Sequence, residues 1–311
     1  MARAGSILPL TLLLLASCAR PYANAPGSGG DRGMPVGLEV TWWIVDDALQ
    51  PAKEPLAEVL GDYADRELPG AGAARELWRA NGLRVLAVPV PELEIVRARL
   101  SISGPVHEQW LGILSDWTPI ISGPAVPEPF SVRLDSGSLG LPPGRLRLLA
   151  RAWPTPVEPA PSEPLPSDGR MPALLELEIL PQHAQDAPRD PLGRAMGARA
   201  PGVLDQGQPF SRLTLTLLSR GKDAILIVPT APADDWPDAS KARPSASASA
   251  GGWAGPGGPE VPGETPLHAL GPTPSPSPSL GQLMLSDPAH PLRRGVLVLI
   301  PHAPERFELG R

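Results

Sequence analysis

The feature that most limits how this chain can fold is its high content of proline and glycine, which break helices and strands. The chain of 311 residues holds 44 Pro and 32 Gly, together about a quarter of the total, which approaches the composition of aperiodic disordered chains. Yet 42% of the residues are hydrophobic, which is enough to fill a core. We therefore expect ordered parts separated by proline-rich ones, and the length allows one large or two small domains.

The most extended interruption covers residues 231–279. It contains an alternating Ser-Ala run over 245–250 and alternating Pro with Ser or Thr over 272–278. Such a segment cannot bury enough apolar area to offset the entropy lost on ordering, so it is predicted to be a disordered insertion. The chain is then expected to return to the folded body with C-terminal strands over 280–311.

Residues 38–125 are predicted to form a small unit of strand, helix, strand and helix. The first strand, 38–45, is rich in β-branched and aromatic residues. A helix over 72–80 and a strand over 83–88 follow. The second helix, 91–100, begins with proline and carries Glu early and Arg late, as the helix dipole favours.

Residues 126–230 read as a β-rich body. The segments 145–151 and 174–179 alternate apolar and polar residues, with Arg on one polar face and Glu on the other, so antiparallel pairing would bring opposite charges together. A second hairpin is expected from 210–218 and 224–228. The fold class predicted is therefore α+β, a small N-terminal unit followed by a mainly antiparallel β body with long proline-rich disordered insertions.

One internal echo links distant parts of the chain. Residues 225–232 and 297–304 are both apolar strands that end at a proline followed two residues later by Ala-Pro. Proline cannot donate to a strand ladder and so ends both strands. The two are predicted to be neighbours in one sheet.

The first 18 residues resemble a bacterial lipoprotein signal. Arg3 precedes an apolar run over 7–15 that is too short to cross a bilayer. The tetrad 15–18, Leu-Ala-Ser-Cys, has the aliphatic residue, the two small residues and the cysteine of a lipobox. The alternative is an ordinary secretory signal with an incidental cysteine. Because Cys18 is the only cysteine, the chain cannot form an internal disulfide.

This resemblance implies that residues 1–17 are a signal peptide and that Cys18 carries acyl chains as the mature N-terminus. Such a protein is held in the cell envelope, facing the periplasm. Because Ala19 rather than Asp follows the cysteine, the outer membrane is favoured over the inner one. Residues 18–37 are predicted to be a flexible tether.

No constellation of residues in the sequence indicates catalysis, and no metal or cofactor is expected. The five histidines do not stand at metal-ligand spacing from one another or from a carboxylate. Asp46 and Asp47 end the first strand, where open sheets place catalytic groups. They could serve a carboxylate-dependent hydrolase, or they could simply lie in a solvated turn. With a formal net charge of −6 and no basic patch, the chain has no electrostatic footprint for nucleic acid.

Three of the eight tryptophans are candidates for partner contacts. Trp43 lies on the second face of the first strand, and Trp236 and Trp253 lie within the 231–279 insertion, where an aromatic side chain could anchor a partner. Core packing or a small apolar interface explains the remaining tryptophans.

The region 145–308 resembles the core of bacterial secretins in the order of its segments. A hairpin ending in 177–181, Leu-Glu-Ile-Leu-Pro, comes first, and a strand pair turning at Gly221 follows. The segment 280–283, Leu-Gly-Gln-Leu, precedes an apolar strand that ends at Pro301. The resemblance implies a component of a secretion or pilus system, and it departs from the family in lacking the usual Pro-Leu-Gly signature before the final strands.

Taken together, the sequence predicts a non-enzymatic cell-envelope lipoprotein that acts through protein–protein interaction. Its expected partners are the membrane, through lipid on Cys18, and an envelope protein whose identity the sequence does not give. A degenerate secretin-related component and a carboxylate-dependent hydrolase are the two alternatives.

Overall fold

The computed structural model describes residues 35–47, 53–64, 66, 68, 72, 74–157, 170–184, 202–230, 234, 236, 278–287 and 289–308. The predicted signal peptide, Cys18 and Trp253 lie outside these residues, as does most of the 231–279 insertion.

The first of two large sheets has the strand order β2-β11-β13-β1-β3, with β12 also paired to β13. All neighbouring strands in it are antiparallel. Its members are β1 (Gly37–Asp46), β2 (Leu83–Pro89), β3 (His107–Gly112), β11 (Asp223–Pro229), β12 (Ser286–Asp287) and β13 (His290–His302).

The second sheet has the order β10-β8-β7-β4, with β9 and β14 also paired to β8. Its members are β4 (Leu114–Val126), β7 (Gly144–Pro156), β8 (Arg170–Ala184), β9 (Gly207–Pro209), β10 (Leu215–Ser219) and β14 (Arg306–Glu308). A separate hairpin consists of β5 (Phe130–Leu134) and β6 (Gly137–Leu141).

The helices of the described residues are short. They are α1 (Leu56–Gly61), α2 (Ala74–Ala80), α3 (Leu93–Arg99) and α5 (Leu280–Leu285), with single 3-10 turns at η1 (Val90–Glu92), η2 (Leu204–Gln206) and η3 (Ser211–Leu213). Helices of six or seven residues are not stable by themselves and depend on the sheets against which they pack.

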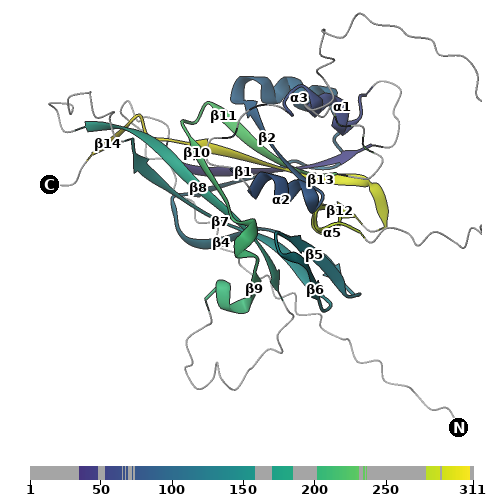
Figure 1. Cartoon of the computed structure of the whole chain (residues 1–311). Helices are drawn as coiled ribbons and strands as arrows, with labels where there is room; N and C mark the ends of the chain where they lie inside the picture. Colours follow the sequence, from purple (N-terminus) through teal and green to yellow (C-terminus); the bar gives the residue numbers. More distant parts are fainter. Residues whose placement is uncertain are drawn as a thin grey trace, which may run out of the picture. The chain divides into compact units, whose positions relative to one another are not determined.

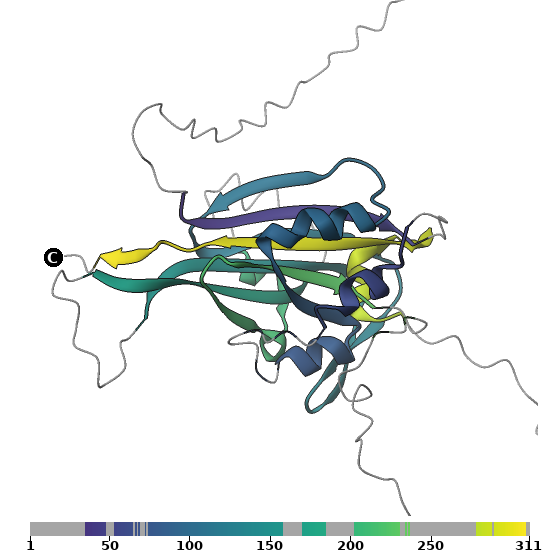
Figure 2. The same cartoon turned by 90° about the horizontal axis from the view of Figure 1, so that it is seen from above.

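The first sheet is the middle of three layers. Figure 1 shows α1 and α3 on one of its faces and the second sheet on the other, and Figure 2 gives the view from above. The inner core lies between the sheets, where buried side chains of β1, β2, β11 and β13 meet those of β7, β8 and β10. The outer core lies under α1 and α3. Strands covered on both faces should be apolar, as β11 is after its first residue, Asp223.

The α+β fold class predicted from the sequence is wrong. Strands make up 57% of the described residues and helices 19%, so the fold is β-rich. The predicted N-terminal unit fails for a topological reason: β1 and β2 are not neighbours, because β11 and β13 lie between them. Its sheet is completed by strands more than a hundred residues away in the sequence, which a local pattern cannot reveal.

The pairing of 145–151 with 174–179 is confirmed. These segments lie in β7 and β8, which are antiparallel with Arg151 opposite Glu178, and the two side chains form an ion pair. The Arg151 guanidinium also lies 4.9 Å from the ring centres of both Trp117 and Trp153. The prediction that the similar segments 225–232 and 297–304 are neighbours in one sheet is also confirmed, because Ile225 lies opposite Leu299 where β11 pairs with β13.

The hairpin predicted from 210–218 and 224–228 is wrong. β10 pairs with β8 in the second sheet, whereas β11 lies between β2 and β13 in the first. The turn at Gly221, with a φ of 78°, therefore carries the chain from one sheet to the other. β10 has one solvated face, which suits the second sheet, because that sheet is covered on one side only. The apolar β11 needs cover on both faces and therefore lies in the first sheet. The strand pair on which the likeness to secretins depended is thus absent.

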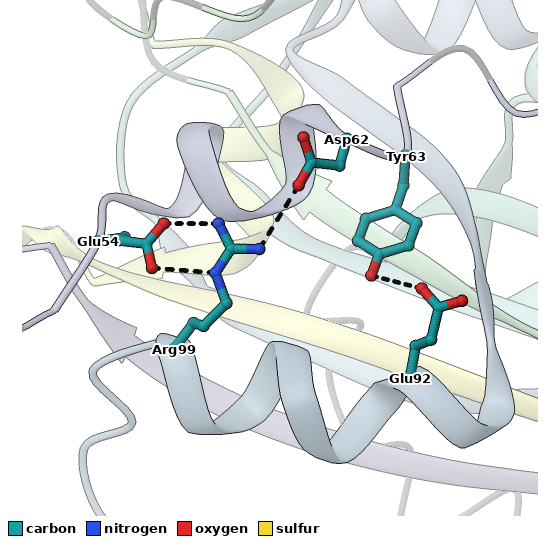
Figure 3. A network of polar contacts seen from close by, with 5 residues as sticks. All are labelled: Glu54, Asp62, Tyr63, Glu92 and Arg99. Atoms are coloured by element: carbon teal, nitrogen blue, oxygen red, sulfur yellow. Dashed lines mark hydrogen bonds and ion pairs between the residues drawn. The ribbon is translucent and has the colours of Figure 1, made fainter.

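Polar contacts hold α1 and α3 together over the outer core (Figure 3). The guanidinium of Arg99 donates to both carboxylate oxygens of Glu54, at 3.0 and 2.5 Å, and to Asp62 at 3.5 Å. The hydroxyl of Tyr63 donates to Glu92 at 2.8 Å. The bond from Arg99 lowers the pKa of Glu54, while burial and the bond to Glu92 raise the pKa of Tyr63. The network fixes the spacing of the two helices.

One histidine is part of the core. His183 of β8 is fully buried, and its ring lies edge-on to Phe130 with centroids 5.6 Å apart. Residue 144 beside it must be glycine, because a Cβ there would overlap the imidazole. Burial lowers the pKa of His183, although the nearby Pro142 carbonyl favours the charged ring.

We expect His183 to make stability depend on pH. Its folded pKa is depressed, so the unfolded chain binds more protons just below the ordinary value of 6.5. Stability is therefore full above that value and falls as the pH drops through the folded pKa. Thermal unfolding between about pH 7 and about pH 5 should show a steeper loss for the native chain than for His183→Gln. The exposed His107→Gln serves as control, and equal slopes in all three proteins would contradict this role.

Candidate binding cleft between the sheets

The inner face of β1 is not covered along its whole length. Leu38, Val40, Trp42 and Ile44 share this face by the two-residue period of a strand. Leu38 and Val40 are 0% and 6% exposed, whereas Trp42 and Ile44 are only half-buried. The two sheets therefore pack closely at the start of β1 and leave its later residues uncovered.

The indole of Trp42 lies close against a glycine of the neighbouring strand. Gly295 on β13 lies opposite Ile44, and a Cβ at this position would overlap the indole of Trp42. Glycine thus lets the ring lie against the sheet instead of standing out from it. Together with Val40, Ile44 and Leu297, the ring forms the floor of a cleft of about 720 Å³, a volume typical of ligand pockets.

Two different walls enclose this floor. On one side, Ile120 and Ile121 of β4 and Met284 and Leu285 at the end of α5 form an apolar wall. On the other side is β3, the edge strand of the first sheet, and it is polar, with exposed side chains at His107 and Gln109. The floor of the cleft is therefore apolar, the first wall is mainly apolar with Ser122 and Ser286 beside these residues, and the second wall is polar.

The apolar wall depends on how α5 docks. Ser279 and Gln282 form a capping box that begins the helix. Gly281 lies so close to the carbonyl of Gly82 that a side chain would not fit. Gly82, with a φ of 73°, follows the buried Asn81, whose side-chain amide bonds both the N–H and the carbonyl of Arg133 at 2.8 and 2.7 Å. The turn after α2 thus positions both α5 and the β5–β6 hairpin.

The mouth of the cleft carries charged groups in pairs. Arg293 lies 3.4 Å from Asp46, and Asp287 of β12 lies 2.9 Å from the imidazole of His290. The hydrogen bond with His290 lowers the pKa of Asp287, so its carboxylate is ionised. The mouth is therefore polar, with each of these charges beside a partner.

The structure gives Asp46 and Asp47 structural contacts. Neither lines the cleft. The carboxylate of Asp47 forms an ion pair with Arg294 and accepts the N–H of Leu56 at 3.1 Å, where α1 begins. Arg294 also bonds Asp234 at 2.5 Å. Asp47, Arg294 and Asp234 are buried side chains, 6%, 9% and 7% exposed respectively, so this cluster is not an open site for a substrate.

Two of the tryptophans proposed for partner contacts are interior residues. Trp43 and Trp236 are 3% and 6% exposed and belong to the outer core. The guanidinium of Arg84 lies 4.5 Å from the ring centre of Trp236. The indole N–H of Trp236 donates to Asp234 at 3.2 Å. Neither ring is accessible to a partner in this conformation. Sequence reasoning instead missed Trp42, because its contact with Gly295 joins strands at opposite ends of the chain.

The other histidines differ in their surroundings. His302 lies 3.0 Å from Glu39 and packs edge-on against Trp110, whereas His268 is outside the described residues. Within the ranges that the structure covers, no three His, Cys, Asp or Glu residues gather as a metal site would require. None of the helices in those ranges is long and apolar enough to span a membrane.

The buried cluster gives a stability prediction with a matched control on the adjacent residue. Arg294→Met should lower the free energy of unfolding by about 3–5 kcal/mol, because it leaves two buried carboxylates without their cation. Arg293→Met, which removes a half-exposed pair, should cost about 0–1 kcal/mol. Urea unfolding monitored by circular dichroism measures both. Equal losses in the two variants would show that Arg294 has no special role.

Comparison with known proteins adds no family to this description. The chain matches no protein-family model, and neither the curated proteins nor the solved structures contain a detectable relative.

Proposed function

We propose that this chain is a lipid-anchored protein of the cell envelope that acts by binding rather than by catalysis, and that the cleft between the sheets is its binding site. The anchor rests on the lipobox-like residues that end at Cys18. The observation that carries the binding role is the half-buried state of Trp42 and Ile44 on a face that is otherwise core. Leaving apolar side chains in a concave, uncovered position costs stability, which is offset when a ligand covers them.

The alternatives gain no such support. The hydrolase hypothesis required Asp46 or Asp47 to line a concave pocket with other polar groups. Neither lines the cleft: Asp46 pairs with Arg293 at the mouth, and Asp47 pairs with the buried Arg294. The secretin-related hypothesis loses the strand pair at Gly221, because those strands belong to different sheets.

The binding role is tested with an apolar fluorescent probe, N-phenyl-1-naphthylamine. We expect saturable binding at one site, and Ile44→Asp should weaken it by about tenfold or more, because a charge on the floor resists burial. Ile95→Asp is the matched control, since Ile95 is 60% exposed on α3 and far from the cleft in sequence and layer. Absence of saturable binding, or equal binding by both variants, would refute the proposal.

An envelope protein as partner is a second candidate, and the edge of the first sheet suits it best. β3 pairs with β1 alone among the described strands, and an unpaired edge can accept an added strand. Trp110 and Ile113 at its end are 44% and 52% exposed. These are the large apolar side chains that protein interfaces cover.

A pull-down tests this candidate. Lipidated protein from detergent-solubilised envelopes should recover one partner in stoichiometric amount, and the double variant Trp110→Ser, Ile113→Ser should lose most of it, because the apolar contact is gone. Ile95→Ser controls for removal of an exposed apolar side chain, and Cys18→Ala controls for the anchor. Mass spectrometry that finds the bait alone in every form would exclude a stable protein partner.

A further inference from the structure

We propose that the cleft holds the acyl chain of a single-chain amphiphile whose head group is zwitterionic or uncharged. This inference rests on the proposed binding function and names the class of ligand. Three features of the cleft carry it: the shape of the floor, its apolar character, and the charge at the mouth.

The floor is a row and not a round pocket. Val40, Trp42 and Ile44 succeed one another on the same face of β1, over a length of roughly 13 Å at the usual rise per strand residue. Met284 and Leu285 border this row from α5. Methionine adapts its shape to irregular apolar partners. An elongated apolar group fits such a row, whereas a compact ring would cover only part of it.

The floor of the cleft offers no hydrogen-bonding side chain besides the indole of Trp42. Among the described residues, no side chain that lines the cleft holds a buried polar atom without a hydrogen-bond partner. A ligand that placed hydrogen-bonding groups on the floor would leave them unsatisfied, at a cost. The buried part of the ligand is therefore hydrocarbon, and its polar part stays at the mouth or along β3.

The mouth selects against a net negative charge on the head group. Its fixed cation, Arg293, lies beside Asp46, and its fixed anion, Asp287, lies beside His290. His107 is the remaining ionisable group that lines the cleft. An anionic head would meet one guanidinium, that of Arg293, and two carboxylates, those of Asp46 and Asp287, so repulsion outweighs attraction at the rim. A zwitterionic head can satisfy charges of both signs at once.

The test uses the full chain carrying Cys18→Ala, so that no acyl anchor competes for the cleft. The probes are palmitoyl-lysophosphatidylcholine, palmitate and glycerophosphocholine, each titrated against bound N-phenyl-1-naphthylamine below the concentration at which micelles form. We expect the lysolipid to displace the dye at one site, palmitate to bind no more tightly, and glycerophosphocholine, which has no chain, to have no effect. Affinity for the lysolipid should change less than about twofold between low and high salt.

Two variants locate the ligand. Gly295→Ala forces the indole of Trp42 off the sheet and into the cleft, so it should weaken lysolipid binding about tenfold. Gly140→Ala is its control, because a Cβ there meets nothing within 4 Å. Should Gly295→Ala fail to fold, Ile44→Asp, at a half-buried position, provides the same readout.

Each outcome decides one claim. If the dye binds but the lysolipid does not displace it, the ligand class is wrong and the binding function stands. If palmitate binds about tenfold more tightly than the lysolipid, the inference about the head group is overturned. If the lysolipid binds Gly295→Ala and Ile44→Asp as well as the native chain, its site is not the cleft. If the dye itself shows no saturable binding, the proposed function fails.

Discussion

The pairing of the first described strand with the last long one is the interaction on which the rest of the structure depends. β1 and β13 are antiparallel over ten residue pairs, from Gly37 with His302 to Asp46 with Arg293. Both strands bury both faces along most of this length, the inner one against the second sheet and the outer one under α1 and α3. Without β13, the sheet would divide into β1 with β3 on one side and β2 with β11 on the other. The apolar area buried on two faces is what offsets the entropy lost by joining distant segments of the chain.

The cleft follows from a mismatch between the three layers. The helices cover the outer face of β1 as far as Val45, which is 1% exposed. The second sheet covers its inner face only as far as Val40, so Trp42 and Ile44 are left at the opening. β4, the edge of the second sheet, pairs with β7 through three register irregularities, and such irregularities bend an edge strand. A bent edge does not close on β3, and the gap between the two edges remains accessible.

At two places the shape of the cleft requires a glycine, because another group lies so close to the backbone that a side chain would not fit. Gly295 accommodates the indole that forms the floor, and Gly281 brings α5 against the turn at Gly82 to form the wall. A methyl group at either position would push the neighbouring group toward the cleft. These glycines therefore connect the backbone geometry of the core to the dimensions of the candidate site.

The sequence by itself determined what depends on neighbouring residues. The strand at 38–45 follows from its β-branched and aromatic residues, and the pairing of β7 with β8 was indicated by complementary charge, as Arg151 and Glu178 show. The similar apolar runs that end at proline predicted that β11 and β13 are neighbours, and the two strands do pair, antiparallel, with Ile225 opposite Leu299.

Only the tertiary structure decided the rest. The short connection at Gly221 is compatible with a hairpin and with a crossing between sheets, and burial of both faces of β11 selected the crossing. Trp43 and Trp236 were predicted to contact a partner, yet both are buried in the outer core. Asp47 proved structural because Arg294, far away in the sequence, neutralises it. The cleft is the extreme case, since whether an apolar residue such as Trp42 is core or site depends on how far the opposing sheet extends, and no local pattern contains that information.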